Sequence, residues 1–281
     1  MKKGLSRIFQ VVKDAVFPAR CMACRCLFLK KQDGTQPDVI FDMPMGSSHK
    51  ALFEMLMAPF LCEDCLREFM EIDSPLCPRC GQMFRERVSD DHLCGQCLIS
   101  PGKISFARAA GVYETSLMHM IRAFKYRGKT QAARPFGRLL FFLYCRHYAE
   151  GLRKGSLPDV IIPVPLHIRR FRQRGFNQAW LLVKEWPEFF RRLNQENHPQ
   201  VIKDGLVRHR FTKPQAGLDK KSRKTNIKGA FGLSKKLDVT GKHILLVDDV
   251  YTTGATAEEC AAVLLKNGAR AIDILTLSRT C

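Results

Sequence analysis

Eight of the twelve cysteines in this chain form four pairs with two residues between the partners. The pairs are Cys21/Cys24, Cys62/Cys65, Cys77/Cys80 and Cys94/Cys97. This spacing lets two thiolates of one tight turn bind the same tetrahedral Zn²⁺ ion at about 2.3 Å. Four thiolates fill the coordination sphere and leave no position for a substrate. The pattern therefore predicts two structural zinc ions and no catalytic metal among the cysteines.

The sequence does not decide which cysteine pairs share a zinc ion. We expect sequential sites, with the first two pairs on one ion and the last two on the other, although an interleaved arrangement satisfies the same spacing. Cys26 forms a Cys-x-Cys pattern with Cys24, so either thiol can complete the first site. His49 and His92 are expected to be surface residues without a role in metal binding.

A second pattern that indicates chemistry lies between Ile244 and Thr256. Residues 244–247 are apolar and predict a buried strand, with Asp248 and Asp249 at its carboxyl end. The start of a predicted helix follows, with the residues Thr252, Thr253, Gly254, Ala255 and Thr256. The amides and the dipole of a helix N-terminus bind a phosphate dianion. Neighbouring carboxylates suit a ligand that also carries a diol or Mg²⁺, and a ribose 5-phosphate meets this description.

Alternating strands and helices after Pro101 can position this loop. Strands are expected over 106–113, 160–162, 244–247 and 271–277. Helices are expected from a cap at Thr115 or Ser116 to beyond Phe124, and over 130–150, 177–193 (capped by Asn177) and 255–266. This order predicts an α/β fold with a mostly parallel sheet flanked by helices. Ligands of such sheets bind at the carboxyl ends of the strands.

The charge divides the chain at about the same place as the cysteines. Residues 1–105 carry 14 Lys and Arg against 13 Asp and Glu, whereas residues 106–281 carry 32 against 14. We therefore expect an amphipathic helix over 1–20, a zinc module over 21–100 and a basic α/β domain over 101–281. The helix is expected to dock on one of these modules, and a peripheral membrane contact is the alternative.

The hydrophobic segments are too short for a membrane span. The longest uninterrupted apolar run is Leu139 to Cys145, whereas a spanning helix needs roughly twenty residues. Arg7, Lys13 and Asp14 interrupt the apolar part of the N-terminal segment, so we expect no secretory signal. We expect a cytoplasmic protein, in which thiols stay reduced and cysteine pairs indicate metal instead of disulfides.

Several motifs carry a resemblance to known families. Residues 245–256, LLVDDVYTTGAT, resemble the 5-phosphoribosyl-1-pyrophosphate (PRPP) motif of type I phosphoribosyltransferases. The segments 163–178, PVPLHIRRFRQRGFNQ, and 208–215, RHRFTKPQ, with the later positions Leu218, Arg223, Asn226 and 229–231, resemble the ComF family. The resemblance covers about residues 18–281. It implies a type I phosphoribosyltransferase-like fold behind a double zinc ribbon, although the segment 30–50 departs from a compact ribbon.

The resemblance also implies roles for the matching positions. Asp248 and Asp249 would contact the ribose hydroxyls of PRPP, with magnesium bound alongside, and residues 252–256 would wrap its 5-phosphate. The turn that begins Pro163, Val164, Pro165 would be the pyrophosphate loop, and residues 209–226 would form a flap. Cations for the pyrophosphate would come from Arg169, Arg170, Arg172, Arg174 and, in the flap, Arg223. Purine-salvage transferases carry an acid where this chain has Thr252, so binding of PRPP is better supported than any particular transfer, and no catalytic residue is assigned.

Two functions of different classes follow. One is magnesium-dependent transfer of phosphoribose from PRPP to an acceptor that the sequence does not identify. The other is a non-catalytic protein that binds single-stranded nucleic acid or acts as an adaptor and uses PRPP only as a ligand. The resemblance implies a link to DNA in either case, because the ComF family is associated with natural competence and uptake of single-stranded DNA. This association implies single-stranded DNA and competence proteins as partners. The net charge of the basic domain suits a polyanion. Phe171 and Phe176 lie among arginines and can stack on bases, although Phe176 can equally pack inward.

Overall fold

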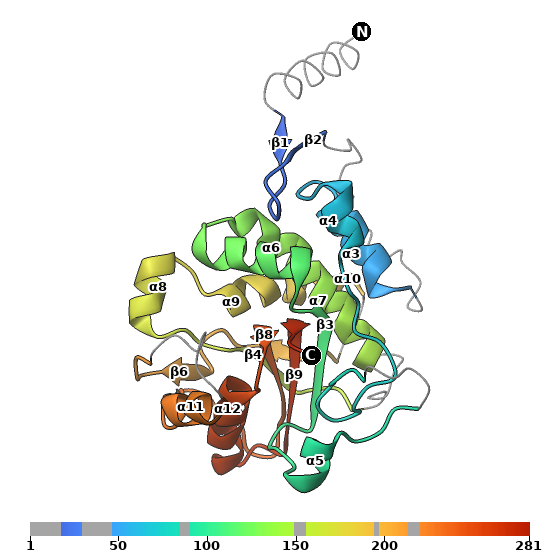
Figure 1. Cartoon of the computed structure of the whole chain (residues 1–281). Helices are drawn as coiled ribbons and strands as arrows, with labels where there is room; N and C mark the ends of the chain where they lie inside the picture. Colours follow the sequence, from blue (N-terminus) through green and yellow to red (C-terminus); the bar gives the residue numbers. More distant parts are fainter. Residues whose placement is uncertain (1–17, 30–46, 85–89, 149–155, 194–196, 213–219) are drawn as a thin grey trace.

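Five parallel strands form the central sheet of the protein. The computed structural model describes residues 18–29, 47–84, 90–148, 156–193, 197–212 and 220–281 (Figure 1). The strand order is β3-β9-β8-β4-β5, and every pairing is parallel. The bounds are β3 Phe106–Val112, β4 Val160–Pro163, β5 Gln200–Val201, β8 His243–Tyr251 and β9 Ala271–Arg279. The carboxyl ends of these strands therefore meet at one edge of the sheet.

Helices cover both faces of the sheet. Strand β8 divides its apolar side chains between them, with Leu245 and Val247 in one core cluster and Ile244 and Leu246 in the other. The first cluster includes the helices α6 Thr115–Tyr126, α7 Ala133–Tyr148, α9 Gln178–Val183 and α10 Trp186–Arg192. The second is built on α12 Ala255–Lys266. A parallel strand covered on both faces is apolar throughout, which explains the uninterrupted run that the sequence shows.

Smaller elements surround this frame. A 3-10 turn, η1 Thr130–Ala132, precedes α7, and α8 Ile168–Arg174 follows β4. Strands β6 Leu206–Arg208 and β7 Phe231–Leu233 pair antiparallel, with α11 Lys220–Ile227 between them in the chain. The cysteine-rich part contributes β1 Ala19–Arg20, β2 Leu27–Phe28, α3 His49–Met57, α4 Glu63–Arg67 and α5 Gly95–Ile99. Figure 1 shows the β1–β2 hairpin and α5 at opposite ends of the view.

The fold class predicted from the sequence is confirmed. The sheet is parallel, helices flank it, and a small cysteine module precedes it. The core does not stop at the expected boundary near residue 100, because Leu52 and Phe53 of α3 belong to the same apolar cluster as α6 and α7. Among the described residues, no helix combines the length and the apolar character that a membrane span requires.

Three details of the predicted elements were wrong. The helix expected over 177–193 is two helices, α9 and α10, because Pro187 lacks an amide proton and its ring would clash with the carbonyl of Val183. The N-cap of α6 is Glu114, which makes no side-chain cap bond, in place of Thr115 or Ser116. The helix expected over 1–20 lies mostly outside the described residues, and its last two positions form β1.

Glu71 connects the cysteine module to α7. Its carboxylate accepts hydrogen bonds from the His49 amide at 2.7 Å and the Ser48 hydroxyl at 2.5 Å, so it caps α3 from a distant part of the chain. Nδ1 of His49 lies 2.8 Å from the same carboxylate, and Nη1 of Arg146 lies 3.7 Å away. His49 is 3% exposed, and the expectation of a surface residue was wrong because Glu71 and the Phe142 ring enclose it. His92 is exposed, as expected.

We predict that Glu71→Gln lowers the free energy of unfolding by about 2 kcal/mol at pH 7. Burial alone would raise the pKa of Glu71, but hydrogen bonds from His49 and Ser48 lower it to about 2. A lowered pKa means that the ionised carboxylate stabilises the fold above about pH 4.5, and that this contribution is lost as the pH falls toward 2. Urea unfolding between pH 3 and 7 measures the difference.

The control for this prediction is Glu63→Gln, which removes an exposed carboxylate from an exposed i,i+4 pair and should change stability little. Equal unfolding free energies for the wild type and Glu71→Gln at pH 7 would contradict the assignment of Glu71 as a connection between the two parts.

Candidate phosphate site and zinc centres

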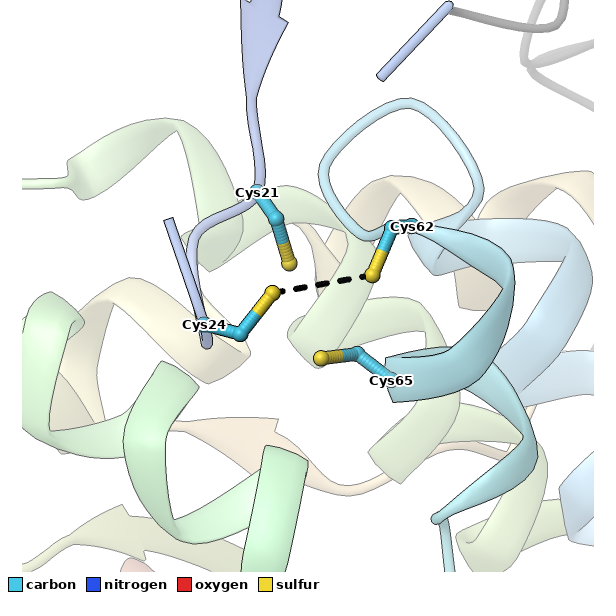
Figure 2. Close-up of side chains that lie close together, drawn as sticks. All are labelled: Cys21, Cys24, Cys62 and Cys65. Atoms are coloured by element: carbon cyan, nitrogen blue, oxygen red, sulfur yellow. Dashed lines mark hydrogen bonds between the residues drawn. The ribbon is translucent and has the colours of Figure 1, made fainter. Parts of the chain in front are cut away.

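The first cysteine group brings together Cys21, Cys24, Cys62 and Cys65. All four sulfurs lie within 4.8 Å of one another. Figure 2 shows them pointing toward a common centre, two from the turn between β1 and β2 and two from the start of α4. The Sγ atoms of Cys24 and Cys62 are 3.7 Å apart. A tetrahedral ion with bonds of about 2.3 Å separates its ligands by about 3.8 Å, so this group fits Zn²⁺.

The second group consists of Cys77, Cys80, Cys94 and Cys97, again within 4.8 Å. The Sγ atoms of Cys80 and Cys94 are also 3.7 Å apart. The Cys77 turn closes with Gly81, whose φ of +69° is left-handed, and Arg25 adopts the same φ at the matching place after Cys24. The groups confirm the sequential division of the pairs. The structure places Cys24, and not Cys26, with the other three thiols of the first group.

The segment with the phosphate pattern forms a strand, a turn and a helix. Strand β8 extends through both aspartates to Tyr251, beyond the expected end at Val247. Gly254 is the N-cap of α12 with a φ of +74°, and this glycine has no side chain with which to cap the helix. The hydroxyl of Thr253 is buried without a hydrogen-bond partner among the described residues. The turn thus combines a helix N-terminus with an unused hydroxyl, and both are groups that bind phosphate.

The two carboxylates differ in their surroundings. Asp249 is 5% exposed and forms an ion pair with Lys125 of α6, with 2.7 Å between Oδ1 and Nζ. Asp248 makes no ion pair of this kind within the described part of the chain. Burial and the neighbouring Asp249 raise its pKa to about 7, although Lys125 lowers it in part. The sheet edge therefore holds one neutralised carboxylate and one whose negative charge a bound cation would stabilise.

The turn after β4 lies next to these carboxylates, because Pro163 pairs with Val247 in the sheet. Asn177 holds it by donating from Nδ2 to the carbonyl of Val164 at 3.2 Å. Pro165 is buried, and α8 follows with a series of arginines. Thus the expected pyrophosphate loop and the expected phosphate turn are neighbours at one edge of the sheet.

Arginines from two elements converge beside this edge. Arg170 donates from Nη2 to the carbonyl of Thr212 at 3.0 Å, and Arg208 donates to the Thr212 hydroxyl at 2.5 Å. Arg208 is 7% exposed, and its Nε has no partner among the described residues. Burial and Arg170 lower the pKa of Arg208 to about 10, whereas Asp248 acts in the opposite direction. Arg174 lies over the ring of Tyr126 at 4.9 Å.

Two residues of this edge were not predicted from the sequence. Lys125 follows Ile121 by four positions, so it lies on the apolar stripe of α6, and a lysine in such a stripe signals a buried charge with a partner. Arg208 stands within the segment 208–215, where nothing distinguishes it from the other basic residues. Arg223 lies in α11, and its side chain is outside the described residues.

Purified protein is predicted to contain two zinc ions per chain. Cys77→Ser is expected to lose one ion and to destabilise the protein, because structural zinc binding is coupled to folding. Cys26→Ser is the matched control, since Cys26 neighbours a ligand but lies outside both groups, and it should retain two ions. Metal analysis of the variants tests both statements. Native protein without zinc, or loss of an ion in Cys26→Ser, would contradict them.

Comparisons with known proteins identify relatives of this chain. Residues 57–98 match the model of the double zinc ribbon domain. The chain is 37% identical over 223 residues to DNA utilization protein YhgH of Escherichia coli K12, covering 78% of this chain and 90% of the relative. A solved structure, a glutamine PRPP amidotransferase from B. subtilis, is 15% identical, with a TM-score of 0.27 and coverage of 68% of this chain and 33% of that one.

A second relative carries a name from natural transformation. Competence protein F of Haemophilus influenzae is 34% identical over 221 residues, and the alignment covers 78% of this chain and 90% of that protein. The shared region exceeds the zinc ribbon and includes most of the α/β part. With this identity over nine-tenths of each relative, the chain belongs to the ComF family.

Proposed function

We propose that the protein binds PRPP with magnesium at the carboxyl edge of its sheet and serves the use or uptake of DNA. The observation that carries the proposal is the convergence at this edge of a helix N-terminus with an unused Thr253 hydroxyl, two aspartates, the buried Arg208 and the half-buried Arg170. The two relatives, whose names refer to DNA utilization and competence, support the link to DNA. We also propose that the chain divides near residue 100 into a zinc module and an α/β domain. We further propose a cytoplasmic location, where the zinc thiolates stay reduced.

The charges match the parts of such a ligand. Residues 252–256 would hold the 5-phosphate through helix amides and hydroxyls. Asp248 and Asp249 would face the ribose hydroxyls, and Asp248, whose burial disfavours its charge, would gain from Mg²⁺ nearby. Arg170 and Arg208 would meet the pyrophosphate. When bound, magnesium would supply charge neutralisation to the phosphate oxygens.

Lys125 has a role of its own in this proposal. Its ammonium contacts Asp249 at 2.7 Å, and the lysine side chain is only 17% exposed, so it holds the carboxylate in one orientation and neutralises it. A ribose hydroxyl that donates to Asp249 would then meet a fixed acceptor. Breaking such a buried pair leaves an uncompensated charge, and this distinguishes Asp249 from Asp248 in any mutational test.

We predict that Asp248→Asn lowers the affinity for PRPP at saturating magnesium by at least about tenfold, because one charged ligand is worth about 1.4 kcal/mol or more. The fold should keep its stability, since the substitution removes a half-buried charge that desolvation and Asp249 disfavour. Adding Asp249→Asn should abolish binding but also destabilise the fold, because Lys125 loses its partner. Calorimetric titration and thermal unfolding measure the two effects.

Asp238→Asn is the control for this series, because Asp238 is a solvent-exposed aspartate before β8. It should bind PRPP like the wild type. Unchanged PRPP affinity in Asp248→Asn would remove the carboxylates from the site. A wild-type protein that does not bind PRPP with magnesium would overturn the proposed function itself.

A second function, binding of single-stranded nucleic acid, is favoured by exposed aromatic rings beside arginines. Phe211 is 41% exposed and lies 5.4 Å from the Arg169 guanidinium. Tyr126 is 69% exposed beneath Arg174, and Phe171 is exposed on the same helix, α8. Phe176 instead stacks on Phe124 of the core, so it does not offer a face to bases. Exposed rings and cations together suit stacking and phosphate binding.

Substitution of Tyr126 and Phe211 by alanine is predicted to weaken single-stranded DNA binding by about tenfold or more, since each stacked base contributes about 1–3 kcal/mol. The salt dependence of binding should stay the same. Arg169→Gln should instead reduce the salt slope by about 0.7 log units for each phosphate that the arginine neutralises in the wild type. Arg270→Gln, an exposed arginine on the loop before β9, is the control. Absence of DNA binding at low salt would exclude this second function.

A further inference from the structure

The second zinc centre is connected to the phosphate turn through a chain of direct contacts. Its first member is Arg279, the last residue of β9, which is 7% exposed. One guanidinium nitrogen, Nη1, donates to the carbonyl of Cys80. The other, Nη2, lies 3.7 Å from the Cys80 sulfur and 2.8 Å from Oε1 of Gln82. A zinc ligand and the residue just beyond its turn thus hold the end of a central strand.

The next member of the chain of contacts is Tyr251. It is the partner of Arg279 in the β8–β9 register, and the guanidinium lies 5.0 Å from its ring. The amide of Thr280 donates to the Tyr251 carbonyl at 3.1 Å. The tyrosine hydroxyl reaches the phosphate turn itself, because a Cβ atom at Gly254 would collide with it. Tyr251 therefore packs directly against the backbone of the turn at Gly254.

A separate connection runs from the end of the zinc module to α12. The amide of Lys103 donates to Oε2 of Glu258 at 2.7 Å, and a side chain at Gly102 would collide with the same carboxylate. The Arg79 side chain, within the Cys77 turn, donates to the carbonyls of Gly102 and Ile104 at 2.7 and 3.1 Å. Glu258 lies in the first turn of α12. The first connection thus ends at the phosphate turn, and the second ends at the first turn of the helix that follows it.

The first zinc centre has different surroundings. Three of its ligands, Cys21, Cys62 and Cys65, belong to the apolar cluster of α6 and α7. The β1–β2 hairpin that carries two of its ligands lies far from α5 and α12 in Figure 1. A weak polar contact from this region to the α/β part is the bond from Gln131 to the sulfur of Met22 at 3.8 Å. The two centres therefore differ in what they support.

We propose that the second zinc centre controls the phosphate turn: zinc at Cys77, Cys80, Cys94 and Cys97 holds Arg279 and Tyr251 in place, and its loss loosens residues 252–254. Groups that hydrogen-bond to metal ligands orient them and depend on them in turn. Without the ion, the Cys80 turn loses its fixed geometry, and Arg279 loses its acceptors. Zinc occupancy, and any oxidant or chelator that changes it, would then regulate phosphate binding. The binding part of this proposal rests on the proposed function.

The test compares Cys97→Ser, which removes a ligand of the second centre, with Cys24→Ser, which removes one of the first. Hydrogen exchange of the segment 251–258 is the primary measurement, because it needs no ligand. We expect each variant to retain one zinc ion by metal analysis. Exchange in 251–258 should be at least about tenfold faster in Cys97→Ser, and at the wild-type rate in Cys24→Ser. Equal exchange in both variants would overturn the proposal.

Arg279→Gln keeps all eight cysteines of the two zinc groups and serves as the second variant, in case Cys97→Ser does not fold. It should retain two zinc ions and show faster exchange in 251–258, with PRPP affinity reduced by about tenfold; Arg270→Gln is the matched control. Wild-type exchange in Arg279→Gln would contradict the proposed path. If the exchange changes as expected but wild-type protein does not bind PRPP, the coupling stands and the proposed function fails.

Discussion

Burial of β8 on both faces is the constraint on which the rest of the structure depends. Its neighbours β4 and β9 satisfy its backbone, and helices on each side exclude water from Ile244 to Val247. Charged groups that are to meet a ligand can be placed only where this burial ends, because an unpaired buried charge is costly. The carboxyl edge of the sheet is that place, and both aspartates, the glycine turn and the helix N-terminus occur there in sequence.

The charged side chains at this edge have different partners, and the two signs lie on different sides. Lys125 forms an ion pair with Asp249 and neutralises it. Asp248 forms no ion pair among the described residues, and burial and the neighbouring Asp249 raise its pKa to about 7. Arg170 and Arg208 are both held by hydrogen bonds to Thr212. The result is a site with a cationic side and an anionic side. In the proposed function, a ligand that carries both phosphates and hydroxyls, or phosphates and magnesium, would satisfy both sides at once.

The cysteine module shares polar contacts and an apolar core with the α/β part. Glu71 connects it to α7, and α3 shares an apolar core with α6 and α7. The second zinc centre reaches the end of β9 through Arg279. A small ribbon has too little core to be stable alone, and zinc supplies the missing stability. The zinc-bound ribbon can then hold the end of the strand that it contacts, which is β9.

The sequence by itself determined the features that depend on local spacing. Pairs of cysteines two residues apart, the apolar run before Asp248 and the glycine at 254 each specify a turn or strand through backbone geometry. Only the tertiary structure decided which distant groups meet. Lys125 reaches Asp249, and Arg279 reaches Cys80 across 199 positions, because sheet order and helix packing bring them together. The periodicity of the sequence does not predict such contacts. Each contact depends on how whole helices and strands pack, and not on the residues that neighbour it in the sequence.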